Sequence, residues 1–161
     1  MRVAVGFDHA GVSLRETVVA LLELGGHAVI DCGTDSEGSV DYPLHAGRAA
    51  TLVSDGDADR AVLACGSGTG VCIVANKFTG VRAVNARDVN EIEMARRHND
   101  VNVLTLAGRG LDTEQATQIV RAFFGTSFEG GRHARRVQQI AEIEAGELIV
   151  ETPPPITEPA T

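Results

Sequence analysis

The chain has 161 residues, the length of a single globular domain. Its 14 basic and 22 acidic residues give a net charge of −8, and all basic residues except Lys77 are arginine. This balance argues against a general nucleic-acid binder, which would obtain its affinity from basic contacts to phosphates. Whether every arginine lies on a solvated face, or some of them build a site, is left open by composition alone.

Three cysteines occur in the chain, Cys32, Cys65 and Cys72. Their odd number and the lack of CxxC spacing predict neither a disulfide framework nor a zinc site. Met1 leads directly into the strand-like residues 3–5, and no stretch approaches the roughly 20 apolar residues of a membrane span. We therefore expect a soluble, cytoplasmic protein without a signal peptide that binds no membrane.

Short β-rich apolar runs alternate with longer stretches of helical period, which is typical of βαβ units around a parallel sheet. Strands are expected near residues 2–7, 28–32, 60–65, 80–85 and 102–107. Helices are expected near residues 11–24, 43–54, 69–77, 87–98 and 112–125, followed by a last helix near 130–146. We assign residues 1–146 to one domain. Four of the five prolines follow within nine residues, so residues 147–161 are predicted to be a flexible tail.

A glycine-rich motif, Cys65-Gly66-Ser67-Gly68-Thr69-Gly70, follows the third predicted strand. Ligands of open parallel sheets bind at this end of the strands. Alternate glycines allow backbone N–H groups to turn toward one point, and the following helix adds partial positive charge. Neither a dinucleotide fingerprint nor a P-loop fits the spacing. The motif predicts a cradle for a small oxyanion or a hydroxyl-rich ligand beside a thiol that could accept a proton; the alternative is a tight turn with a buried Cys65.

Asp8 and His9 follow the first predicted strand and should face the same crevice. Both side chains can exchange protons or bind hydroxyl groups. The alternative role of Asp8 is to cap the following helix.

His98 and Asn99 end the fourth predicted helix just before the fifth strand, at its amino end. That position lies away from the crevice of their own subunit, so a catalytic role would require an interface between subunits. The alternative is that the cationic residues there only offset the helix dipole.

Arg132 and Arg136 are four residues apart on the last predicted helix, so their guanidinium groups could hold one phosphate together. Arg109, after the fifth strand, is a third candidate. A solvated helix face rich in arginine and glutamate is the alternative.

In combination, seven motifs resemble the type B ribose-5-phosphate isomerases and related sugar-phosphate isomerases. They are GFDHAG at 6–11, VDYP at 40–43, CGSGTG at 65–70, ANKFTGVRA at 75–83, RHND at 97–100, LAGR at 106–109 and EGGRHARRV at 129–137. The resemblance covers residues 1 to about 145. It implies an α/β fold, a Rossmann-like α/β/α sandwich with a five-stranded parallel sheet and a C-terminal helix. It also implies a homodimer or a dimer of dimers with active sites shared between subunits.

The resemblance further implies roles for single residues. Cys65 would be the base that moves a proton between C1 and C2, His98 of the partner subunit would help to open the sugar ring, and Asp8 would assist. The enediolate would be held by Gly66, Ser67, Gly68, Thr69, Gly70 and Asn99. The substrate, mainly its phosphate, would be bound by His9, Arg109, Arg132 and Arg136. The ligand implied is a small sugar phosphate, and no metal or organic cofactor is implied.

Some members of this family use a glutamate at the position of Val71 as the base, so Cys65 places the chain in the cysteine type. We expect interconversion of ribose 5-phosphate and ribulose 5-phosphate through a cis-enediolate. The alternatives are an isomerase of a four-carbon erythrulose phosphate or of allose or galactose 6-phosphate, and a non-catalytic sugar-phosphate-binding module. A thiol hydrolase is a further alternative.

Overall fold

The computed structural model describes residues 1–148 and 151. The described chain forms a parallel sheet of five strands in the order β2-β1-β3-β5-β4. The strands are β1 (Arg2–Phe7), β2 (Ala28–Asp31), β3 (Arg60–Cys65), β4 (Ala83–Asn85) and β5 (Val103–Ala107). After a 3-10 turn at Val12–Leu14, the helices are α1 (Arg15–Leu24), α2 (Tyr42–Ser54), α3 (Thr69–Ala75), α4 (Val89–Asn99), α5 (Thr113–Gly125) and α6 (Arg132–Glu144).

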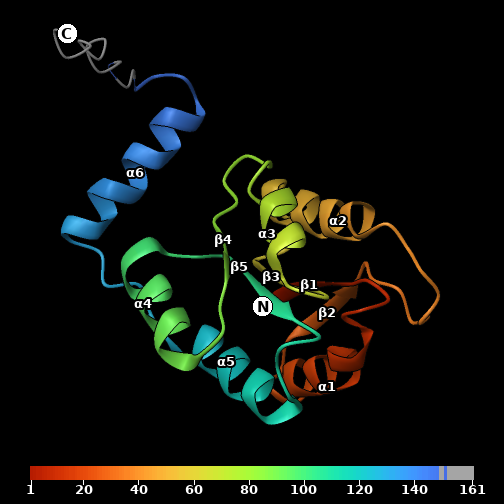
Figure 1. Ribbon diagram of the computed structural model, residues 1–161. Helices are drawn as coiled ribbons and strands as arrows, with labels where there is room; N and C mark the ends of the chain where they lie inside the picture. The colour runs from red at the N-terminus through yellow and green to blue at the C-terminus, as the bar shows by residue number, and fades with distance from the viewer. Residues whose placement is uncertain (149–150, 152–161) are drawn as a thin grey trace, which may run out of the picture.

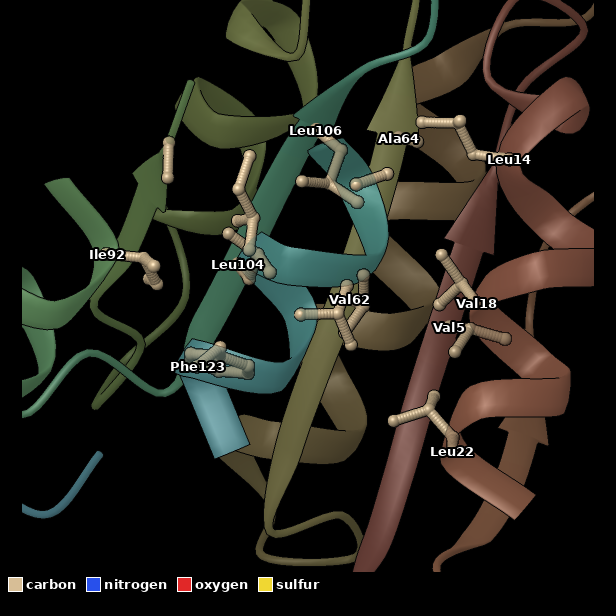
Figure 2. Close-up of a cluster of buried hydrophobic side chains, with 14 of the residues drawn as sticks. Val5, Leu14, Val18, Leu22, Val62, Ala64, Ile92, Leu104, Leu106 and Phe123 are labelled. Atoms are coloured by element: carbon tan, nitrogen blue, oxygen red, sulfur yellow. The ribbon is translucent and has the colours of Figure 1, made fainter. Parts of the chain in front are cut away.

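Helices cover both faces of the sheet, because successive side chains of each strand point to opposite faces and both sets are apolar. Val5, Val62 and Leu104 pack with α1, α4 and α5 on one face, which Figure 2 shows in close-up. Ala4 and Ala61 face α2 and α3 on the other side (Figure 1). These layers confirm the predicted Rossmann-like α/β/α sandwich.

The sheet order places the crevice between β1 and β3. From β1 the chain continues outward to β2, whereas β3 begins the other half of the sheet. The loops after β1 and β3 therefore leave toward opposite faces, and the gap between them is where such sheets bind ligands.

The predicted elements are confirmed with small differences in their bounds. The first helix begins as a 3-10 helix at Val12 and becomes α-helical at Arg15, rather than starting at residue 11. Among the strands, the largest difference is that β4 begins at Ala83 rather than near residue 80. Gly80 has a positive φ of 74°, and the Arg82 N–H donates to Asn102 Oδ1 at 2.8 Å. Residues 80–82 thus form a turn held by a side chain and do not extend the strand.

The last helix, α6, packs against α4 and lies outside the two helix layers (Figure 1). The predicted tail, residues 147–161, falls outside the described residues except for Glu147, Leu148 and Glu151. None of the described helices is long and apolar enough to cross a membrane.

Candidate active site

A hollow of about 490 Å³ lies at the carboxyl ends of β1, β3 and β5. Its size is within the range of small-molecule sites. It is lined by Asp8, His9, Ala10, Tyr42, Cys65, Gly66, Ser67, Gly70 and Arg109. The structure thus brings together seven of the residues that the sequence placed after separate strands or in the glycine motif, and Gly68 and Thr69 belong to the same loop.

Asp8 combines a structural contact with a free oxygen. The side chain is 4% exposed, and its Oδ1 accepts hydrogen bonds from the N–H groups of Ala10 and Gly11, both at 2.8 Å. The Oδ2 atom has no hydrogen bond to any described residue. One carboxylate oxygen therefore ties the turn after β1, and the other can bind a substrate hydroxyl.

A backbone N–H group of a neighbouring loop orients the imidazole ring of His9. Its Nδ1 accepts a hydrogen bond from the Val40 N–H at 3.2 Å. In a neutral imidazole the proton then resides on Nε2, so His9 presents a donor to the ligand.

Cys65 ends β3 and is 5% exposed, at the wall of the hollow. Tyr42 lies over the glycine loop, because a Cβ atom on Gly70 would come within 2.7 Å of Tyr42 Cζ. Only glycine at position 70 permits this approach. Sequence reasoning gave Tyr42 no role, although the VDYP motif that contains it was a usable signal.

Arg109 contributes the positive charge of the hollow. The backbone N–H of Arg109 donates to Gly66 O at 3.1 Å, and the Arg109 side chain runs past the same glycine. Within residues 1–148 the Arg109 guanidinium pairs with no carboxylate, so it is available to an anionic ligand.

The other predicted site residues, His98, Asn99, Arg132 and Arg136, do not line this hollow. His98 instead stacks on His133, with ring centroids 4.2 Å apart and planes 3° from parallel. Burial lowers the pKa of His133, and the adjacent His98, Arg132 and Arg136 lower it further, against the opposing effect of Glu129. This lowering of the pKa favours the neutral form of His133. Sequence reasoning assigned His133 no role.

His98, His133 and Glu129 gather three potential metal ligands within 4.8 Å of one another. The Nε2 atoms of both histidines lie 3.8 and 3.9 Å from Glu129 Oε2. An ion bound in the plane of one ring would lie outside the plane of the other, because the rings are parallel. Imidazole binds metals through an in-plane lone pair, so this arrangement does not suit one metal ion.

The end of α4, which carries His98, is fixed by two arginines. Asp100 has a left-handed backbone conformation, with φ 46° and ψ 48°. Arg96, 4% exposed, donates to Asp100 Oδ1 at 2.8 Å, and Arg82 donates to Asp100 Oδ2 at 3.1 Å and to its carbonyl at 2.8 Å. These contacts hold a strained backbone position directly after the predicted catalytic helix end.

A buried thiol and carboxylate, an imidazole donor and an unpaired arginine converge at the switch point of a Rossmann-like sheet. This set suits proton transfer on a small, hydroxylated anion, which is the class of a sugar-phosphate isomerase.

Comparisons with known proteins agree with this class. The ribose/galactose isomerase family matches residues 3–140. The chain is 43% identical over 143 residues to ribose-5-phosphate isomerase B of Escherichia coli, covering 89% of this chain and 96% of the relative. It is 36% identical over 145 residues to D-erythrulose-4-phosphate isomerase of Pectobacterium atrosepticum, covering 89% and 95%. The chain belongs to the ribose/galactose isomerase family.

Solved structures confirm the fold. Ribose-5-phosphate isomerase B of Clostridium thermocellum superimposes with a TM-score of 0.88 at 40% identity, covering 91% of this chain and 99% of that one. The enzyme of Mycoplasma genitalium with bound ribulose-5-phosphate gives a TM-score of 0.85 at 34% identity, covering 89% and 96%. The protein is thus an isomerase, an intramolecular oxidoreductase, as its motifs led us to expect.

Proposed function

We propose that the protein interconverts ribose 5-phosphate and ribulose 5-phosphate through a cis-enediolate, with Cys65 as the base. The observation that carries the proposal is the convergence of Cys65, Asp8 and the glycine loop (residues 66–70) in one hollow, where Gly66, Ser67 and Gly70 of the loop form part of the lining. The relative named for this reaction is 43% identical over nearly its whole length.

Aldose–ketose isomerisation needs a base that reaches both carbons and donors for the charge that develops on oxygen. Cys65 takes the proton from one carbon and returns it to the next. The N–H groups of the glycine loop hold the oxyanion, and Asp8 assists ring opening through its free oxygen. His9 and Arg109 hold the phosphate, whose binding orients the reacting carbons.

The remaining groups come from a second copy of the chain in a homodimer or a dimer of dimers. His98 of the second copy acts as the ring-opening acid, Asn99 helps to hold the enediolate, and Arg132 and Arg136 hold the phosphate. Their absence from the hollow of their own chain supports this assignment. The exposed apolar side chains Ile73, Ile140 and Ile143 on α3 and α6 offer surface for such an interface. Three unpaired thiols fit the reducing cytoplasm, where we place the enzyme.

The second candidate substrate is a four-carbon erythrulose phosphate, favoured by the relative that is 36% identical. The two substrates share the chemistry at C1 and C2 and differ in the distance from these carbons to the phosphate. The residues that hold the phosphate therefore decide between them.

The test is kcat/KM over a panel of ribose 5-phosphate, erythrulose 4-phosphate, allose 6-phosphate and galactose 6-phosphate. We expect ribose 5-phosphate to exceed each other substrate by about tenfold or more, because a misplaced phosphate loses orienting contacts. If another member of the panel gives a higher kcat/KM, that sugar phosphate becomes the assigned substrate, and the assigned reaction, aldose–ketose isomerisation, stands. Tight binding without turnover of any member contradicts the isomerase assignment.

A further inference from the structure

We propose that Thr105 and Asn85 are positioning residues that set the orientation of the glycine loop, so that its N–H groups face the oxyanion of the substrate. The inference rests on the proposed function, since it concerns the oxyanion of that reaction. Neither residue lines the hollow, so each acts through the loop.

Thr105 holds the loop from β5. Its side chain is completely buried, and its Oγ1 donates to Gly68 O at 3.0 Å. The same carbonyl accepts the Cys72 N–H at 3.2 Å. A hydroxyl in the interior of a strand thus forms its hydrogen bond with the catalytic loop.

Asn85 holds the loop from the end of β4. Its Nδ2 donates to Ser67 O at 3.0 Å and contacts Thr69 Oγ1 at 3.4 Å. Its Oδ1 is buried and forms no hydrogen bond with any described residue. A Cβ atom on Gly68, which has a φ of +73°, would lie 2.3 Å from this oxygen. Leaving the buried Asn85 Oδ1 unpaired lowers the stability of the fold. The position of Asn85 against the loop is therefore better explained by a role in placing the loop than by a contribution to stability.

Three successive peptide carbonyls of the loop are therefore fixed, those of residues 66–68. Their donors are the N–H of Arg109, the side chain of Asn85 and the side chain of Thr105, all on the β5 and β4 side of β3. The C=O and N–H groups of a planar trans peptide point in opposite directions. The N–H groups of Ser67 and Gly68 consequently point toward the β1 side, where the hollow with Asp8 and Cys65 lies. The N–H of Thr69 instead donates to Ser67 Oγ at 3.3 Å.

Successive N–H groups that point to one side form a concave anion site. Their catalytic value depends on being aimed before the charge develops, since no energy is then spent on turning them. Loss of one carbonyl anchor frees a peptide plane to rotate. The expected effect falls on the transition state more than on substrate binding, which relies on the phosphate.

The test compares Thr105→Val with Thr105→Ser. Valine keeps the shape and removes the hydroxyl, whereas serine keeps the donor. We expect kcat to fall about 10- to 100-fold in Thr105→Val with KM within about threefold, and Thr105→Ser to retain most of kcat. The affinity for a phosphorylated hydroxamate, whose planar anionic head resembles the enediolate, should fall in parallel with kcat. Equal losses in both variants, or a valine variant with kcat within about twofold of the parent, would overturn the proposal.

Asn85→Ala is the second variant and keeps the proposal falsifiable if Thr105→Val does not fold. As in Thr105→Val, both kcat and the affinity for the hydroxamate should fall, and unchanged values contradict the role of Asn85. Thr117→Val is the matched control, because it removes a hydroxyl that donates to Thr113 O at 2.8 Å within α5; its kcat should match the parent. If the parent protein turns over no sugar phosphate, the proposed function fails, while hydroxamate binding by parent and variants still tests the positioning role.

Discussion

Cys65 is the residue on which the proposed reaction depends, because it is the lining side chain best suited to move a proton between neighbouring carbons. In Cys65→Ala we expect kcat to fall at least about 10³-fold, with substrate affinity within about threefold, since the phosphate contacts remain. Steady-state kinetics and calorimetric titration measure the two quantities. Cys32→Ala is the matched control, because Cys32 also follows a strand but does not line the hollow; its turnover should equal that of the parent. Near-normal turnover by Cys65→Ala would remove Cys65 as the base.

Single residues differ in how far the sequence could predict them. Asp8, His9, Cys65 and Arg109 were predictable because each lies at or just after the carboxyl end of a strand, and these ends share one edge of a parallel sheet. Thr105 was not predictable, because a threonine inside an apolar strand has the pattern of an ordinary strand residue. Its partner, Gly68 O, is 37 residues away in the sequence, and only the folded sheet brings the two together.

Among the elements, the end of α4 depends on the buried guanidinium of Arg96. We expect Arg96→Met to lower the free energy of unfolding by about 1–3 kcal/mol, because the Val101 carbonyl loses the buried donor that Arg96 provides. The ion pair with Asp100 adds little to this cost, since the Asp100 side chain is 37% exposed and stays held by Arg82. Urea unfolding measures this loss, and kcat should fall with it, since His98 precedes Asp100 by two residues. Arg97→Met is the control on the same helix. Its pair with Glu93 is partly exposed, so the expected cost is below about 0.5 kcal/mol. Equal costs for the two variants would contradict the role assigned to Arg96.

Element types followed from local patterns, whereas element order did not. Helical spacing of Leu14, Val18, Leu21 and Leu22 predicted the first helical segment. Leu14, Val18 and Leu22 are buried, and Leu21 is partly buried. The position of β4 at the sheet edge, with β5 between β3 and β4, had no local signal. Strand order depends on pairing between segments distant in sequence, which periodicity does not report. The same limit applies to Arg96: its place in the last helical turn suggested a cation that only offsets the helix dipole, and only the packing of α4 shows it buried.

At the scale of the whole molecule, the predicted site residues form two groups in different parts of one chain. One group lines the hollow, and the other lies at the end of α4 and on α6. The hollow contains the proposed base, and the end of α4 contains the proposed acid. The sequence placed Cys65 at the carboxyl end of one strand and His98 just before the amino end of another. These opposite ends of the sheet were the signal that His98 would act in the site of a partner copy. Which surface the copies would share was not predictable, because the exposed apolar residues Ile73 on α3 and Ile140 and Ile143 on α6 lie far apart in the sequence.

Mixing two inactive variants tests the shared site directly. Cys65→Ala lacks the proposed base and His98→Asn lacks the proposed acid, so each homodimer should be inactive. In a mixed dimer, one site combines both substitutions, and the other combines an intact Cys65 with an intact His98. Half of the dimers are mixed after random exchange of equal amounts, so activity should recover to about a quarter of that of the parent. Size-exclusion chromatography with light scattering confirms the assembly, and a mixture of each variant with itself is the control. Failure to recover activity despite verified subunit exchange would show that Cys65 and His98 do not act in one shared site.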